Sequence, residues 1–87
     1  MVENEVRDTI KSVLLNNFDI EPEKFDWNTP LEDLQQKFSQ LGYLVFFEQV
    51  INDHFGAKFQ ILENINAALH SPNDVYQLIQ EELKTNP

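Results

Sequence analysis

The stretch from Phe38 to Phe59 holds the longest apolar run of the chain, both of its glycines and five of its seven phenylalanines. Within this stretch, apolar residues recur at helical intervals, at Leu44, Phe47, Ile51 and Phe55. A period close to 3.6 residues predicts a helix with one apolar face. Gly56 follows directly, in the position where a glycine cap ends many helices. The sequence therefore predicts a central helix that begins between Ser39 and Tyr43 and ends at Phe55.

Two further amphipathic helices are expected at the two ends of the chain. The first spans residues 3–17, and its apolar side consists of Val6, Ile10, Val13 and Leu14. The last opens at residues 71–74, where Ser-Pro-Asn-Asp forms a capping pattern with proline at the first helical position. Its apolar side consists of Val75, Leu78, Ile79 and Leu83. A short helix is expected between Glu63 and His70.

The segment from Phe18 to Pro30 breaks the helical period. Its two prolines restrict the residues before them to extended conformations. We interpret it as a long ordered loop that is anchored to the core by Phe18, Ile20, Phe25 and Trp27. Thr29-Pro30-Leu31-Glu32 has a second capping-box pattern, which predicts a short helical turn through Leu34. The predicted fold class is all-α, a small bundle of three long helices plus a short one, with a long loop between the first and second.

Composition limits the kinds of protein that this chain can be. Its 87 residues form one domain, residues 1–87, and no apolar run approaches the length of a membrane span. The N-terminus lacks the basic and apolar regions of a secretory signal. The chain has no cysteine, so disulfides and thiolate metal sites are excluded. We expect a cytoplasmic monomer without a membrane span.

The charge balance is strongly acidic. Fifteen acidic residues against six basic ones give a formal net charge of −9. Nucleic-acid binding depends on neutralising phosphates with lysine and arginine, so this class of function is excluded. An acidic surface instead favours association with basic patches on partner proteins. The alternative is that the acidic residues only form a solvated surface.

No residue pattern indicates catalysis or metal binding. His54 and His70 are far apart and have no cysteine or HExxH context, whereas a metal site needs three or four converging ligands. Acidic pairs such as Glu32-Asp33 and Glu81-Glu82 fall on polar faces, so no carboxyl has the apolar pocket of a general acid. Two glycines do not suffice for a phosphate-binding loop. The sequence predicts that the protein is not an enzyme and holds no metal.

Three segments, in order, resemble the acyl carrier protein family, which includes peptidyl carrier domains. They are TPLEDL at 29–34, FFEQVINDHFGAKF at 46–59 and SPNDVYQLI at 71–79. The resemblance implies a carrier-like bundle that docks to acyl- or peptidyl-processing enzymes. In the family, a phosphopantetheinyl transferase attaches 4′-phosphopantetheine to a serine at the start of the second helix. A helix N-terminus there stabilises the negative charge of the phosphodiester.

The usual Asp-Ser-Leu motif of that serine is absent. In the family the serine lies about 14 residues, or four helical turns, before the aromatic residue that Phe55 matches. Counting back from Phe55 leads to Leu41, and Ser39 is the serine nearby. Two alternatives remain open. Either Ser39 carries phosphopantetheine and an acyl group, or Ser39 is only an N-cap and the protein is a non-carrying relative.

The outer face of the central helix also departs from the family, whose members usually show acidic residues there. The candidate partner-binding residues on this face are Tyr43, Phe46, Gln49, Val50 and Asp53. Aromatic anchors are typical hot spots of interfaces, and they predict a changed set of partners. Phe46 could instead pack under the loop of residues 18–27. The alternative function is a helical adaptor unrelated to acyl carriage, which binds through Tyr43, Phe46 and Val50.

Overall fold

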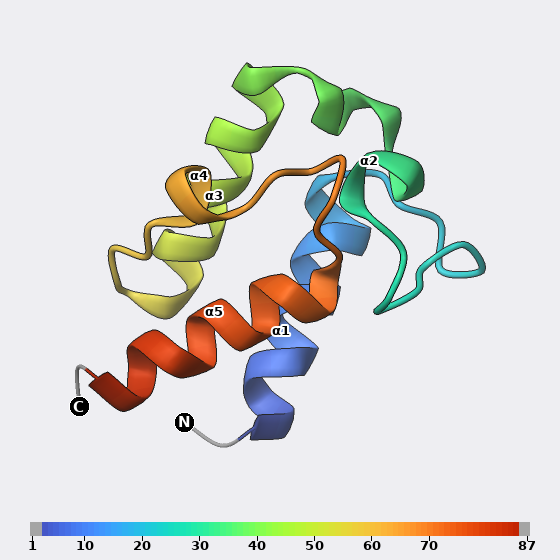
Figure 1. Ribbon diagram of the computed structural model, residues 1–87. Coiled ribbons are helices and arrows are strands. Elements are labelled where there is room, and N and C mark those ends of the chain that lie inside the picture. Colours follow the sequence, from blue (N-terminus) through green and yellow to red (C-terminus); the bar gives the residue numbers. More distant parts are fainter. Residues whose placement is uncertain (1–2, 86–87) are drawn as a thin grey trace.

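The computed structural model describes residues 3–85, which form five α-helices and one 3₁₀ helix and contain no strand (Figure 1). The three long helices are α1 (Glu3–Asn17), α3 (Leu41–Phe55) and α5 (Pro72–Thr85). The short ones are α2 (Leu31–Leu34), α4 (Ile61–Asn64) and the 3₁₀ helix η1 (Gln36–Ser39). The all-α prediction is confirmed. The arrangement of three long helices plus a single short one is not confirmed, because residues 3–85 include two short α-helices and the 3₁₀ helix.

The core lies where the three long helices meet. Helix α1 packs against both α5 and α3, and α4 joins α3 to α5. Figure 1 shows α5 lying across α1, with α3 and α4 beside them. The predicted apolar sides supply fully or almost fully buried residues: Val6, Ile10, Val13 and Leu14 from α1, Leu44, Phe47 and Ile51 from α3, and Val75 and Ile79 from α5. Helical periodicity alone therefore identified the core face of each long helix.

The loop between α1 and α2 is anchored by aromatic side chains, as predicted. Phe18 is fully buried. Its ring lies 5.2–5.5 Å, centroid to centroid, from four other rings, those of Phe38, Tyr43, Phe46 and Phe47. Further along the loop, Phe25 and Trp27 form an edge-to-face pair at 5.2 Å. The Arg7 guanidinium of α1 lies 5.1 Å from the Trp27 ring centroid. The loop is therefore fixed to both α1 and α3.

Of the two predicted capping patterns, the one at residues 71–74 is confirmed. The Ser71 N–H donates to the Asp74 carboxylate at 2.9 Å, and α5 begins at Pro72. This is the reciprocal half of a capping box, in which an acid at the third helical position reaches back to the N-cap backbone. The carboxylate also lies at the positive end of the helix dipole.

The short helical turn predicted through Leu34 is confirmed as α2, but the predicted side-chain cap at Thr29 is wrong. The Thr29 hydroxyl donates to the Asp26 carboxylate at 2.7 Å, and α2 has no side-chain cap. The first N–H groups of α2 find partners far along the chain instead. The Leu31 N–H donates to the His70 carbonyl at 3.0 Å, and the Glu32 N–H donates to the Ala67 carbonyl at 2.9 Å. A backbone segment near α5 therefore replaces the expected side-chain cap.

The short helix expected at residues 63–70 is also wrong. Helix α4 begins earlier, at Ile61, and residue 65 already has an extended backbone. The Leu62 N–H, in the first turn of α4, donates to the Glu48 carboxylate of α3 at 2.8 Å. That carboxylate caps α4 from another helix and so favours the earlier start. Residues 65–70, called the strap below, are irregular and connect α4 to α5.

Replacing each of the two glycines with alanine is expected to change the free energy of unfolding in opposite directions. Gly56 ends α3 in the left-handed conformation, with φ 61° and ψ 38°, whereas Gly42 lies inside α3 with negative φ. A Cβ at either position meets no atom within 4 Å, so backbone conformation alone decides the outcome. Gly56→Ala should lower the free energy of unfolding by about 1–2 kcal/mol. Gly42→Ala should raise it by about 0.5 kcal/mol. Urea denaturation followed by circular dichroism measures both, and changes of the same sign would contradict this account.

Candidate functional site

The five candidate partner-binding residues lie together on one side of α3. Their spacing of three and four residues places neighbours one above the other along the helix. Gln49 and Asp53 are exposed, Tyr43 and Val50 are half-buried, and Phe46 leaves 47% of its surface exposed. We call this set the outer face of α3: Tyr43, Phe46, Gln49, Val50 and Asp53. It presents one aromatic ring to solvent, with one carboxylate one helical turn beyond Gln49.

The aromatic residues of the outer face are held from below by Phe18. The ring of Phe46 lies 5.3 Å from the Phe18 ring, centroid to centroid. The Tyr43 hydroxyl donates to the Phe18 carbonyl at 3.1 Å. Burial, and to a lesser extent the negative charge of Asp19, raises the pKa of Tyr43 above its usual value. Phe46 therefore packs on the loop through Phe18, as one alternative expects, and still leaves 47% of its surface exposed.

Ser39 does not cap α3. It is the last residue of η1, and the N-cap of α3 is Gln40. The alternative in which Ser39 is an N-cap is therefore wrong in its detail. Leu41 is the first residue of α3 and is 70% exposed. It occupies the position that counting back from Phe55 assigns to the serine of the carrier family. Ser39 is exposed and stands two residues ahead of the helix.

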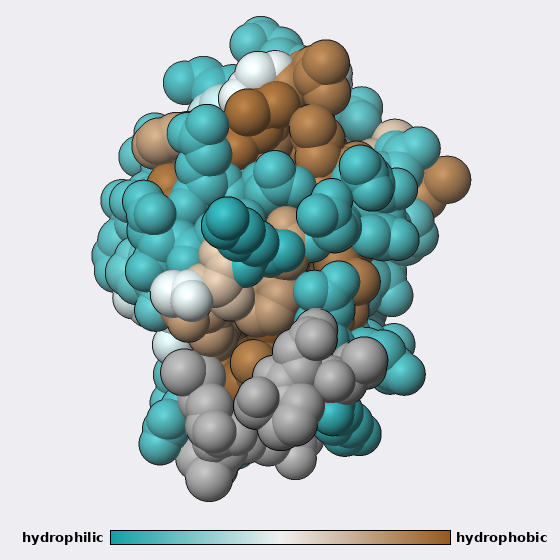
Figure 2. Space-filling model, turned by 90° about the vertical axis from the view of Figure 1, so that its left-hand side faces the viewer, coloured by the Kyte–Doolittle hydropathy of each residue, from teal (hydrophilic) through white to brown (hydrophobic). Residues whose placement is uncertain are grey.

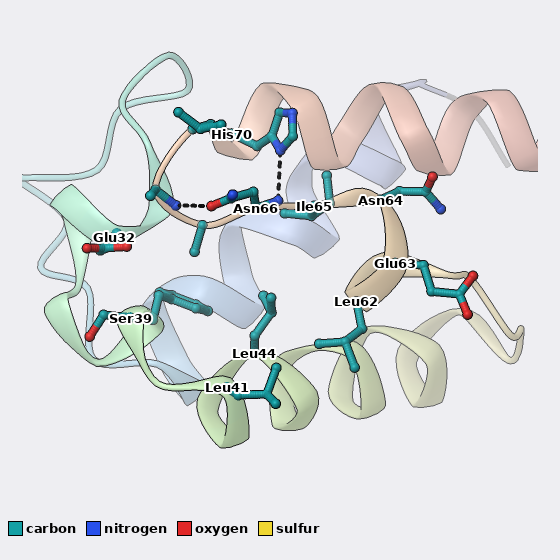
Figure 3. Close-up of a pocket in the computed structure, with 14 residues that line it drawn as sticks. Glu32, Ser39, Leu41, Leu44, Leu62, Glu63, Asn64, Ile65, Asn66 and His70 are labelled. Atoms are coloured by element: carbon teal, nitrogen blue, oxygen red, sulfur yellow. Dashed lines mark hydrogen bonds between the residues drawn. The ribbon is translucent and has the colours of Figure 1, made fainter.

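A groove opens beside Ser39, between the start of α3 and the strap (Figure 3). Its volume is about 620 Å³. In Figure 3, Leu41 and Leu44 point into it from α3, and Leu62 points toward it from α4. Leu69 of the strap also lines it and is 72% exposed. Figure 2 shows apolar surface at the start of α3, near the top of this face, with polar side chains around it. The sequence does not reveal this groove, because the pattern at residues 63–70 predicts a helix where the strap is irregular.

Six of the residues that line the groove are charged or polar: Glu32, Ser39, Glu63, Asn64, Asn66 and His70. Glu32 and Glu63 contribute carboxylates, and His70 contributes its imidazole. The Nδ1 atom of His70 accepts the Asn66 N–H at 2.8 Å. Among residues 3–85, no three histidine, aspartate or glutamate side chains gather in an arrangement that could hold a metal ion. The groove therefore offers apolar contact beside polar side chains, two of which are carboxylates.

No known protein family, curated protein or solved structure matches the chain. The helices formed by residues 3–85 include none with the length and apolar character needed to cross a membrane. The features of the molecule that bear on its function are therefore the outer face of α3, Ser39 and the groove.

Proposed function

We propose that this chain is an acyl-carrier-like protein that acts by docking to partner enzymes through the outer face of α3. The proposal includes a carrier-like arrangement of its helices, with α1, α3 and α5 as the three long helices and the loop of residues 18–30 after the first. The observation that carries it is the position of Phe46. Its ring is held by Phe18, yet 47% of the residue remains exposed. An aromatic side chain that is ordered before binding loses little freedom on docking, which favours affinity.

We propose the non-carrying form of the protein, in which Ser39 bears no phosphopantetheine. A phosphodiester is stabilised at a helix N-terminus, where free N–H groups and the helix dipole meet it. At the first residue of α3 this chain has Leu41, which has no hydroxyl. Ser39 lies in η1 instead, ahead of the N-cap. The partners are acyl- or peptidyl-processing enzymes, and binding or regulating them does not require a phosphopantetheine arm.

Intact mass separates the two forms. The chain is co-expressed with phosphopantetheinyl transferases of broad specificity, alongside a standard acyl carrier protein as a positive control. We expect the unmodified mass for this chain and full modification of the control. An adduct of phosphopantetheine mass that disappears in Ser39→Ala, but persists in Ser12→Ala, would restore the carrying form and 4′-phosphopantetheine as its cofactor.

Docking through the outer face is tested with Phe46→Ala and a matched aromatic control. Phe25 is half-buried in the loop of residues 18–30 and does not belong to the outer face. Binding of purified acyl- and peptidyl-processing enzymes to the immobilised chain is measured by surface plasmon resonance. We expect Phe46→Ala to weaken binding at least tenfold, the size of a hot-spot loss, and Phe25→Ala to leave it unchanged. Equal losses in both variants, or none in Phe46→Ala, would rule out the outer face as the docking surface.

A further inference from the structure

The groove beside α3 has a wall that is fixed before any ligand binds. The strap folds on itself, since the Asn66 N–H donates to His70 Nδ1 at 2.8 Å and the His70 N–H donates to the Asn66 carbonyl at 2.7 Å. The Ala68 N–H donates to the Asn66 side-chain oxygen at 2.9 Å, and Figure 3 shows two of these bonds. Helix α2 holds the strap from outside through the Ala67 and His70 carbonyls. The shape of the groove is therefore set by the fold.

The groove concentrates exposed apolar surface. Within the described part of the chain, three large hydrophobic residues are exposed, and two of them, Leu41 and Leu69, line this groove. They are 70% and 72% exposed. Single exposed leucines are common on protein surfaces, but two exposed leucines in one groove are typical of an interaction site. The groove therefore favours a ligand that covers both leucines.

The charges around the groove select the kind of ligand. Glu32 and Glu63 line it, and within residues 3–85 no lysine or arginine does. The Nδ1 atom of His70 is occupied, because it accepts the backbone N–H of Asn66. A fatty acid or another anion would bring its negative charge close to two carboxylates, which is unfavourable. Lysine and arginine side chains would gain attraction from the same two carboxylates and from the net charge of −9.

We propose that this groove binds a basic amphipathic helix of a partner protein. Apolar side chains of that helix enter between Leu41 and Leu69, and its lysine or arginine side chains approach Glu32 and Glu63. A helix is favoured over an extended strand, because the strap N–H groups of residues 66, 68 and 70 are already bonded and residues 3–85 contain no sheet edge. Leu41 and Leu44 lie on a different side of α3 from Phe46, so this site is independent of the outer face.

The probe is a synthetic helical peptide made of leucine and lysine, with a fluorescent label for anisotropy measurements. We expect saturable binding that weakens as salt is raised. Leu69→Ala and Leu41→Ala should each raise the Kd roughly tenfold, because each removes most of a leucine side chain from the interface. Glu63→Gln should weaken binding at low salt and reduce its salt dependence. Glu23→Gln, an exposed acid in the loop before α2, is the matched control and should leave the Kd unchanged.

Three results would overturn the proposal. One is that the peptide does not bind saturably, and another is that a leucine and glutamate peptide of the same length binds equally well. The third is that laurate binds more tightly than the peptide and loses affinity in Leu69→Ala, which would make the groove a lipid site. Leu41 and Leu69 are largely exposed, so their alanine variants should fold, and thermal melts by circular dichroism verify this. Binding of the peptide to the groove does not depend on whether Ser39 is modified or on whether Phe46 binds partner enzymes.

Discussion

Replacing Phe18 with alanine is expected to lower the free energy of unfolding by about 3–5 kcal/mol. The side chain is fully buried, and its ring contacts four aromatic rings that belong to η1 and α3. Alanine would leave a cavity between the loop and α3, and the loss of the aromatic pairs is part of that cost. A small domain has a total stability of about 5–15 kcal/mol, so this one change brings the chain close to unfolding. Urea denaturation followed by Trp27 fluorescence and circular dichroism measures the loss.

Phe25→Ala is the matched control for this prediction. Phe25 belongs to the same loop, but it is half-buried and pairs with one ring, that of Trp27. Its removal should cost about 1–2 kcal/mol, since less surface is exposed and solvent can fill the space. A loss at Phe18 no larger than the loss at Phe25 would show that the aromatic cluster does not anchor the loop. The backbone carbonyl of Phe18, which accepts hydrogen bonds from Tyr43 and Gln35, is retained in the variant.

The long helices could be predicted because their signals are local. Helix α1 matches the predicted residues 3–17, and α5 begins at the predicted proline. In both helices the apolar period extends over several turns, and no residue far away is needed to define it. The end of α3 at Phe55 follows from Gly56, which adopts the left-handed conformation that glycine tolerates best. Period and cap are both properties of neighbouring residues, so sequence alone reveals them.

The turn predicted through Leu34 forms as α2, but the bounds of α4 and the caps of both short helices could not be predicted, because their partners are distant in sequence. The first N–H groups of α2 bond to carbonyls of the strap, and an N–H of α4 bonds to Glu48 of α3. Nothing in residues 29–34 or 61–64 indicates such partners. The capping pattern at Thr29 was a plausible local signal, but the Thr29 hydroxyl donates a hydrogen bond to the Asp26 carboxylate and does not cap α2. Short helices gain little from propensity, so tertiary contacts decide where they form.

The same distinction applies to the candidate site. The outer face of α3 could be assigned from spacing, because helical geometry brings Tyr43, Phe46 and Val50 together. The start of α3 at Leu41 lies within the predicted range of residues 39–43, but the 3₁₀ helix η1, which places Ser39 ahead of α3, could not be predicted. The groove depends on the strap, whose shape is fixed by hydrogen bonds to a histidine and to α2. A face of one helix is a local property, whereas a groove between segments is not.

Replacing Asn52 with alanine is expected to lower the free energy of unfolding by about 1–3 kcal/mol. Asn52 holds the chain as it leaves α3, because its side-chain oxygen accepts the Phe59 N–H at 2.8 Å and its side-chain nitrogen donates to the Phe59 carbonyl at 3.3 Å. Phe59 is a buried core residue. Alanine would leave both backbone groups without these partners, and an unsatisfied part-buried group costs more than the bond itself contributes. Denaturation in urea measures the stability, and hydrogen exchange at the Phe59 amide measures the local opening.

Asn64→Ala separates this effect from the loss of any asparagine hydrogen bond. The Asn64 side chain donates to the Gln60 carbonyl at 2.7 Å, but the contact is exposed and water can replace it. Its removal should change the free energy of unfolding by less than about 0.5 kcal/mol. Exchange at Phe59 should accelerate in Asn52→Ala and stay unchanged in Asn64→Ala. If Phe59 remained protected in both variants, the turn after α3 would be held by Gly56 and the apolar contacts of Phe55 with Phe59, which lie 5.6 Å apart between ring centroids.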